Sequence, residues 1–329
     1  MKRALLCLVM LVCVLGFVVA GGQQGGESAE ETEPDYPTRP VTIICPWDAG
    51  GGTDMLARGL LTVMGNYFPR PMVVVNRPGG GGTIGTTEAL NAKPDGYTIL
   101  ITGWGPFVTQ PFLMDVPYGD EDYEVVLQLS RYPRILCAKK DAPYDDIKEM
   151  MEYAKANPEK VVVGIASVGT TGHLAMAQLE SEYGVKFTTV PQGGGGPQKV
   201  AVLGGHVDVA PLTASEGGPL VTSGQLKALA IMDSQRFPDI PDIKTGAELG
   251  YPIESGVATH LFVPAGTPAG VKKMLHDAFK NCLEDEAFKT VAVKLNLGAQ
   301  YADAEFAEED IAKFRKIYEK ISAELGLKK

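Results

Sequence analysis

Apolar residues are spaced along this chain in two alternating ways, and the alternation predicts strands that are each followed by a helix. Residues 41–45 are mostly β-branched and apolar, which is typical of a buried strand. The apolar residues that follow recur at helical spacing, at Leu56, Leu60, Val63 and Tyr67. Together the two stretches predict a strand, a turn and an amphipathic helix.

The turn between them contains Gly50, Gly51 and Gly52, and Thr53 follows as the expected cap of the helix. Glycine allows positive φ and leaves backbone N–H groups uncovered. The first N–H groups of a helix lack partners within the helix and carry a partial positive charge. Such a turn can bind an anion. It lacks the closing Gly-Lys-Ser/Thr of a nucleotide loop and the spacing of dinucleotide-binding glycines, so a nucleotide is not the predicted ligand.

Three further strands lead into turns of the same kind. The strands and their turns are residues 72–76 with 79–82, 161–166 with 167–173, and 188–191 with 192–196. A strand at 98–102 ends beside Trp104. Ligands of an open α/β sheet bind outside the carboxyl ends of its strands. Four such turns, two in each half of the chain, predict two lobes that close on a small anion by a hinge motion.

The rest of the chain continues both patterns. Strands are expected at residues 207–213, 226–232 and 261–263, Pro197 at the first position of a helix, and a helix capped by Thr267 with Pro268 at its first position. Two C-terminal helices each carry an apolar stripe that we assign to the core. The stripes are Val271, Met274, Leu275, Ala278, Phe279 and Cys282, then Ile311, Phe314, Ile317, Tyr318, Ile321 and Leu325.

The start of the chain has the features of an export signal. Lys2 and Arg3 precede an apolar run from Ala4 to Ala20, so we predict a signal peptide at 1–20. Residues 21–35 are rich in Gly, Gln, Ser and Glu and predict a disordered tether. The protein is therefore expected in the periplasm or another extracytoplasmic compartment. A tether after a signal also leaves a lipid anchor open, although no cysteine stands at the position that lipidation needs.

Composition narrows the range of partners. The 329 residues carry a formal net charge of −10, or −12 once Lys2 and Arg3 are removed. An acidic surface argues against nucleic acid and anionic membranes, so an anion must be recognised by local donors in a desolvated cleft. Cys45, Cys137 and Cys282 would remain after cleavage of the signal, and their apolar surroundings predict buried thiols and not a disulfide framework.

Eight segments in register resemble one family of proteins. They are residues 36–43, 46–54 with Ala57 and Arg58, 75–82, 93–98, 167–173, 204–208, 226–230 and 262–268. They resemble the substrate-binding proteins of tripartite tricarboxylate transporters, the TctC or Bug family. The similarity extends from Tyr36 to the C-terminus. At the position of Trp47 the family more often has Phe, and its common Tyr-Lys-Gly-Gly stretch reads Gln192-Gly193-Gly194-Gly195 here.

The resemblance implies a two-lobed α/β fold of the periplasmic-binding-protein type II, in which each lobe is a sheet flanked by helices and a ligand cleft lies between the lobes. It places lobe 1 at residues 36–134 plus 257–329 and lobe 2 at 135–256. It implies a solute-binding protein that delivers a small organic carboxylate, a di- or tricarboxylate, to a membrane permease. We expect a monomer with no cofactor, no metal and no catalytic residue.

The expected ligand-binding residues combine the resemblance with the strand-end positions. They are Trp47, Ala49, Gly50, Gly51, Gly52, Thr53, Gly80, Gly81, Gly82, Trp104, Ser167, Gly169, Thr170, Thr171, Gln192 and Gly193. Structural support of the site is expected from Asp54, Arg58, His173 and Asp208. Asp54 and Arg58 have the i,i+4 spacing of an ion pair on a helix, and an acid in contact with a carboxylate ligand would repel it. His206, His260 and His276 lack the spacing of a metal site.

Two other classes of protein are alternatives to a transport receptor. A receptor of the same fold that presents its ligand to a membrane sensor would have the same sequence features. An exported hydrolase would need Ser167 and His173 to act together. No Gly-x-Ser-x-Gly elbow surrounds Ser167, so the sequence argues against this class of enzyme.

Overall fold

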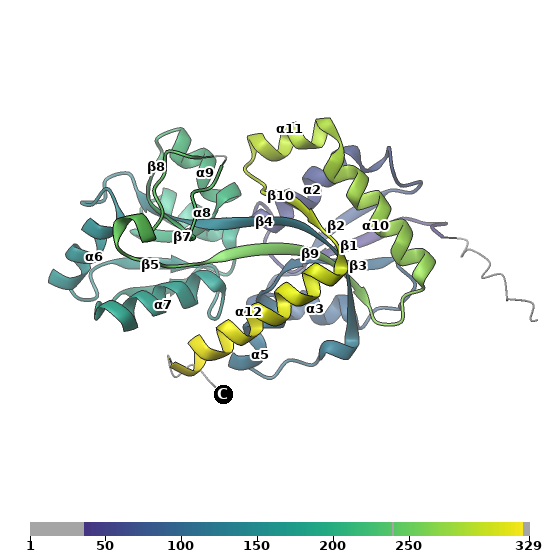
Figure 1. The fold of residues 1–329 in the computed structure, drawn as a ribbon, viewed down its shortest axis with the longest axis horizontal. Coiled ribbons are helices and arrows are strands. Elements are labelled where there is room, and N and C mark those ends of the chain that lie inside the picture. Colours follow the sequence, from purple (N-terminus) through teal and green to yellow (C-terminus); the bar gives the residue numbers. More distant parts are fainter. Residues whose placement is uncertain (1–35, 239, 325–329) are drawn as a thin grey trace, which may run out of the picture. The chain divides into compact units, whose positions relative to one another are not determined.

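The computed structural model describes residues 36–238 and 240–324 (Figure 1). The predicted signal peptide at 1–20, the tether at 21–35 and Leu325 lie outside these residues. None of the described helices is long and apolar enough to cross a membrane.

Ten strands form the sheet that organises the described residues. They are β1 (Val41–Cys45), β2 (Met72–Asn76), β3 (Thr98–Gly103), β4 (Tyr123–Lys139), β5 (Val162–Ile165), β6 (Thr188–Pro191), β7 (Val209–Thr213), β8 (Leu226–Met232), β9 (Gly256–Pro264) and β10 (Ala299–Ala302). The strand order is β2-β1-β3-β9-β4-β7-β5-β6, with β8 and β10 also paired to β4. Strands β1 to β3 are mutually parallel, as are β5 to β7, whereas β4 and β9 run antiparallel to their neighbours. The parallel strands fall into two groups, which are the cores of the two lobes.

Strand β4 belongs to both lobes. Its residues 123–133 pair with β9, and its residues 134–139 pair with β7 and β8. Figure 1 shows β4 and β9 running side by side between the helices of one lobe and those of the other. This 17-residue strand was not among the strands expected from the sequence. The lobe limits at 134/135 and 256/257 stay a prediction, although the partners of β4 change at Arg134 and β9 begins at Gly256.

Helices cover the two groups of strands. They are α2 (Gly52–Met64), α3 (Thr83–Leu90), α4 (Gly105–Val108), α5 (Gln110–Leu113), α6 (Ile147–Ala156), α7 (Thr171–Tyr183), α8 (Gly195–Leu203), α9 (Ala214–Thr222), α10 (Ala269–Glu284), α11 (Glu286–Lys294) and α12 (Ala304–Glu324), with 3₁₀ turns at Gly80–Gly82, Asp120–Asp122 and Ala247–Leu249.

Three predicted helix starts were wrong by one or two residues. The cap of α2 is Gly51 and not Thr53, α8 begins two residues before Pro197, and Pro268 is the cap of α10 and not its first residue. The backbone explains two of these shifts. Gly51 and Pro268 are both in extended conformations of the kind that precede a helix, and this conformation, not the side chain, sets the start.

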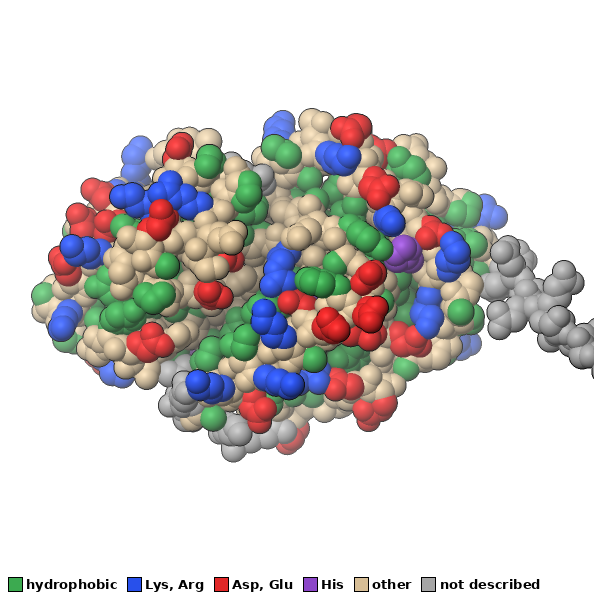
Figure 2. Space-filling view, in the orientation of Figure 1, with side chains coloured by type: hydrophobic (Ala, Val, Ile, Leu, Met, Phe, Trp, Pro, Cys, Tyr) green, Lys and Arg blue, Asp and Glu red, His purple; other side chains and the backbone are tan. Residues whose placement is uncertain are grey.

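The apolar stripes pack largely as expected. In α10 the residues Val271, Leu275, Ala278, Phe279 and Cys282 are buried, whereas in α12 the predicted core residue Ile317 is exposed. Cys45, Cys137 and Cys282 are free and buried, which confirms the prediction for the thiols. Figure 2 shows acidic and basic side chains interspersed on the face that it displays.

His260 is buried in the sheet between β3 and β4. Its register partners are Thr102 and Gln128, and its side chain is fully buried. Neither ring nitrogen has a hydrogen-bond partner among the described residues. Burial, together with the positive charge of Arg131, lowers the pKa of His260 to about 3. The folded protein therefore holds this imidazole in its neutral form.

We expect His260 to make the protein less stable in mild acid. In the unfolded chain the imidazole binds a proton below a pKa of about 6.5, whereas in the folded protein it does so only near pH 3. The contribution of the neutral His260 imidazole to the free energy of unfolding is complete above pH 6.5. It decreases as the pH falls, by about 2 kcal/mol at pH 5. In His260→Leu the fall in unfolding free energy between pH 7.5 and pH 5, measured by urea denaturation, should be smaller by this amount. The exposed His206→Gln is the control, and an equal fall in His260→Leu and the wild type would contradict the argument.

Candidate functional site

One pocket lies where the two lobes meet, and we call it the interlobe pocket. Residues of both lobes line it: Trp47, Gly51, Gly52, Thr53, Gly103, Trp104, Gly105, Tyr132, Arg134, Ala166, Thr170, Thr171, Gly195, Thr213, Glu216 and Val257. Its volume of about 60 Å³ has room for a few water molecules.

The structure brings together about half of the predicted binding residues. Trp47, Gly51, Gly52, Thr53, Trp104, Thr170 and Thr171 line the interlobe pocket. Ala49, Gly50 and Gln192 line a separate, open hollow that also includes Lys199 and His206. Gly80, Gly81, Gly82, Ser167, Gly169 and Gly193 line neither of these two cavities.

The glycines at 81 and 82 have packing roles that the sequence did not indicate. A side chain at Gly81 would meet Gln110, because an ideal Cβ there would lie 2.5 Å from the Gln110 Nε2 atom. At Gly82 a Cβ would lie 3.1 Å from the ring of Trp47. Both glycines also have positive φ. This turn therefore lets Trp47 and α5 approach the backbone closely.

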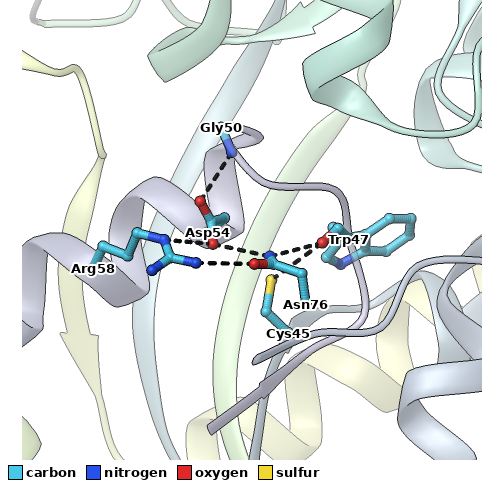
Figure 3. A network of polar contacts seen from close by, with 6 residues as sticks. All are labelled: Cys45, Trp47, Gly50, Asp54, Arg58 and Asn76. Atoms are coloured by element: carbon cyan, nitrogen blue, oxygen red, sulfur yellow. Dashed lines mark hydrogen bonds and ion pairs between the residues drawn. The ribbon is translucent and has the colours of Figure 1, made fainter. Parts of the chain in front are cut away.

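A polar network holds the first turn in place (Figure 3). The Asp54 carboxylate accepts hydrogen bonds from the Gly50 N–H, the Arg58 Nε and the Asn76 Nδ2, each at 2.9 Å. Arg58 also donates to Asn76 Oδ1, and Asn76 donates to the Trp47 carbonyl. Burial raises the pKa of Asp54, but the hydrogen bonds from Arg58, Gly50 and Asn76 together bring it below its usual range. These contacts turn Asp54 and Arg58 away from the pocket and fix the entry into α2.

Two tryptophans form the aromatic part of the pocket. Trp47 is partly buried, and its Nε1 donates to Thr102 Oγ1 at 3.1 Å. Trp104 is almost completely buried and stacks on Phe314, with 4.0 Å between the ring centroids. Trp104 therefore joins the pocket to the core beneath α12, whereas Trp47 is held by the strand beside it.

Four polar residues of the pocket were missed by the sequence analysis: Tyr132, Arg134, Thr213 and Glu216. Arg134, at the point where β4 changes lobes, donates from Nε to Thr171 Oγ1 at 3.2 Å and from Nη1 to the Pro211 carbonyl at 3.1 Å. The Tyr132 hydroxyl is buried and has no hydrogen-bond partner among the described residues. Only β4 brings these two residues to the pocket, and β4 was not predicted.

Glu216 could have been predicted from the sequence as a helix-capping residue. It is the third residue of α9 and forms a capping box with Thr213: the Thr213 N–H donates to Glu216 Oε2 at 2.9 Å, and the Glu216 N–H donates to Thr213 Oγ1. The Thr-x-x-Glu pattern is the known signature of this cap. The other carboxylate oxygen of Glu216 accepts a hydrogen bond from the Gly52 N–H of lobe 1, at 3.1 Å.

The glycine-rich turns of the two lobes contact each other beside the pocket. Lys199 Nζ of α8 donates to the Gly50 carbonyl at 3.3 Å, and Gln110 Nε2 donates to the Val168 carbonyl at 3.2 Å. A Cβ on Gly196 would lie 2.8 Å from the Ala49 carbonyl oxygen. The lobes can approach this closely only because position 196 has no side chain.

The two remaining predicted support residues, His173 and Asp208, do not line the pocket. His173 Nδ1 accepts a hydrogen bond from the Gly169 N–H at 3.0 Å, and burial lowers the pKa of His173. Asp208 accepts a hydrogen bond from the Val162 N–H and pairs with Lys139. In the part of the chain that the structure describes, no cluster of side chains could hold a metal ion.

The chain belongs to the tripartite tricarboxylate transporter family of receptors, TctC, whose family model matches residues 56–323. Members of this receptor family bind a solute and are not enzymes, so the hydrolase alternative is set aside. The match confirms the resemblance, including the fold of a periplasmic binding protein.

Solved structures agree with the family. The periplasmic binding protein BugD is 33% identical with a TM-score of 0.83, over 89% of this chain and 99% of BugD. A Rhodopseudomonas palustris protein solved with adipate is 26% identical with a TM-score of 0.84, over 89% of this chain and 99% of that protein. MatC from Rhodopseudomonas palustris, solved with bound malate, is 28% identical with a TM-score of 0.77, over 86% of this chain and the whole of MatC.

Proposed function

We propose that this protein is an extracytoplasmic receptor that captures a small organic carboxylate in the interlobe pocket. The ligand expected from the family is a di- or tricarboxylate. The protein then delivers it to the membrane permease of a tripartite tricarboxylate transporter. The family and the two relatives solved with malate and adipate support the class of ligand.

The observation that carries this proposal is the set of donors around the pocket. The first residues of α7 and α8 line it, and the start of a helix of this length presents unpaired N–H groups and a partial positive charge. The first N–H of α2, at Gly52, already donates to Glu216 Oε1. Thr53, Thr171 and the Arg134 guanidinium add side-chain donors, whereas the Thr170 hydroxyl donates to the Ser167 carbonyl. Each hydrogen bond from such donors to a carboxylate contributes about 1.5 to 3 kcal/mol when one partner is charged.

Binding of an anion must depend on local hydrogen-bond donors, because the net negative charge of the whole protein repels an anion. The net charge is −10, and the face in Figure 2 mixes acidic and basic side chains without a continuous positive surface. Long-range attraction of an anion is therefore weak. A few charge-assisted hydrogen bonds are enough for micromolar binding, which needs about 8 kcal/mol.

A thermal-shift panel tests the proposal. The purified protein is heated with mono-, di- and tricarboxylates, with amino acids and with neutral sugars. A ligand at 100 times its dissociation constant should add about 2.7 kcal/mol of stability and raise Tm by a few degrees. We expect the rise only with compounds that carry a carboxylate. A rise confined to neutral sugars would contradict the proposed function.

The delivery step has its own test. In cells that take up the identified carboxylate through this receptor, deletion of the permease should abolish uptake and leave binding by the purified receptor unchanged. Uptake that persists without the permease, together with a response of a membrane sensor to the ligand, would favour a signalling partner.

A further inference from the structure

Two opposite charges are buried in the interlobe pocket without being paired with each other. Glu216 is 3% exposed and Arg134 is 9% exposed, and both line the pocket. Among residues 36–238 and 240–324, no ion pair joins Arg134 to Glu216. Buried charges in proteins are normally paired, since an isolated charge in a desolvated site is costly.

Glu216 lies where the sequence predicted the carboxylate of the ligand. Its Oε1 accepts the Gly52 N–H at the start of α2. An ideal Cβ on Gly195 would lie 2.0 Å from the same oxygen, which places the carboxylate against the start of α8 as well. Its Oε2 is held by Thr213. With both oxygens bonded, the side chain is fixed, and the anion site at α2 is filled by the protein itself.

The other side of the pocket is suited to an anion. Arg134 uses Nε and Nη1 for Thr171 and Pro211, and its Nη2 has no partner among the described residues. The start of α7, at Thr171, lies beside the guanidinium through that hydrogen bond. The buried Tyr132 hydroxyl also lacks a partner and lines the same pocket. An ideal Cβ on Gly52 would lie 3.1 Å from this hydroxyl, so Tyr132 reaches the end of the pocket where Glu216 is bonded.

We infer that Glu216 and Arg134 determine the specificity of this receptor, and that its ligand is a small carboxylate which also carries a protonated amine. The carboxylate binds at Arg134 and Thr171, and the ammonium group binds at Glu216 and the Tyr132 hydroxyl. This inference rests on the proposed capture of a carboxylate in the interlobe pocket, and it replaces the di- or tricarboxylate named there by a carboxylate that carries an amine. A ligand with carboxylates at both ends would bring a second negative charge against Glu216, which is unfavourable in a desolvated site.

Matched pairs of ligands test the inference without any variant. Isothermal titration calorimetry of the full chain compares propionate with β-alanine, butyrate with 4-aminobutyrate, and glutarate with glutamate. Each pair differs by an amine. We expect the aminated compound of at least one pair to bind about tenfold tighter or more than its partner. Equal affinities within every pair would overturn the inference and leave the proposed function standing, whereas no binding by any carboxylate would overturn both.

The variant Glu216→Gln tests whether Glu216 causes the preference for the aminated compound. Glutamine can replace glutamate in a capping box, so α9 should keep its start, while the negative charge is removed. The aminated compound should lose its advantage, and the plain carboxylate should bind more tightly than it binds the wild type. A preference that survives unchanged in Glu216→Gln would overturn the role of Glu216.

A closely matched control exists elsewhere in the chain. Glu248 makes the same pair of contacts with Thr245, since Glu248 Oε2 accepts the Thr245 N–H and the Glu248 N–H donates to Thr245 Oγ1. Glu248→Gln removes the same charge from the same two contacts with a threonine, at the 3₁₀ turn Ala247–Leu249 outside the interlobe pocket, where Glu248 also pairs with Arg236. It should leave the preference within each pair of ligands as in the wild type. Far-ultraviolet circular dichroism checks that both variants are folded.

Discussion

Replacement of Gly196 by alanine should weaken binding about 5- to 150-fold without lowering the stability of the ligand-free protein. The added Cβ would lie 2.8 Å from the Ala49 carbonyl oxygen, which belongs to the backbone of the other lobe and cannot rotate away. Forcing an extra methyl group into such a contact costs about 1 to 3 kcal/mol, and every 1.4 kcal/mol is about tenfold in affinity. This cost falls on the arrangement in which the two glycine-rich turns are in contact.

The same substitution should favour the fold of its own lobe. Gly196 is the second residue of α8, and alanine is more stable than glycine inside a helix by up to about 1 kcal/mol. Binding by calorimetry and unfolding temperature without ligand therefore change in opposite directions. Gly65→Ala is the control, because Gly65 ends α2 with φ −60° and no atom lies within 4 Å of an added Cβ.

Small-angle scattering separates the closing motion from other causes of weak binding. The wild type should contract when saturated with its ligand, whereas Gly196→Ala should contract less. Unaltered affinity in Gly196→Ala would mean that the contact between residues 48–52 and 193–196 is not needed for binding.

Replacement of Arg134 by methionine should weaken carboxylate binding by about 30-fold or more. Removal of one partner of a buried, hydrogen-bonded charge pair costs about 2 to 5 kcal/mol of binding free energy. Methionine fills the space of the aliphatic part but offers no donor to Thr171, to the Pro211 carbonyl or to the ligand. Arg134→Lys keeps the charge and loses the forked geometry, so an intermediate affinity is expected.

The control for Arg134 is an arginine outside the pocket. Arg39 is exposed, pairs with Asp95 at 3.4 Å and lies over the ring of Tyr97. Arg39→Met removes the same charge from the surface and should leave affinity unchanged. If Arg134→Met binds the carboxylate within threefold of the wild type, Arg134 does not hold the ligand. Circular dichroism is again needed, since Arg134 also connects β4 to α7 and β7.

Much of the fold could be predicted from the sequence because its parallel strands are locally encoded. The strands β1, β2, β6 and β8 have the predicted limits, and β3, β5, β7 and β9 differ from prediction only at their ends. Strand β4 was missed for a physical reason. It contains Arg131, Pro133 and Arg134, which interrupt the apolar pattern, and its strand conformation depends on antiparallel partners far away in the chain.

Part of the candidate site could likewise be predicted from the sequence, and part could not. The turn at Gly51–Thr53 and the two threonines at the start of α7 follow from local rules for helix starts, and they line the pocket. The contact between Gly52 and Glu216 joins residues 164 positions apart, and no periodicity indicates such a contact. The glycines at 81 and 82 follow the same local rules, yet they serve the packing of Gln110 and Trp47.

The double use of Glu216 restricts how this site can change during evolution. One carboxylate both starts α9 and sets the charge at one end of the pocket. Most substitutions at this position would remove the helix cap together with the charge, at a cost of about 1 kcal/mol to the fold. Glutamine alone keeps the capping geometry while changing the charge. A descendant that turns to a ligand of different charge can therefore do so in one step only through Glu216→Gln, and other routes first need a compensating change at Thr213 or elsewhere in α9.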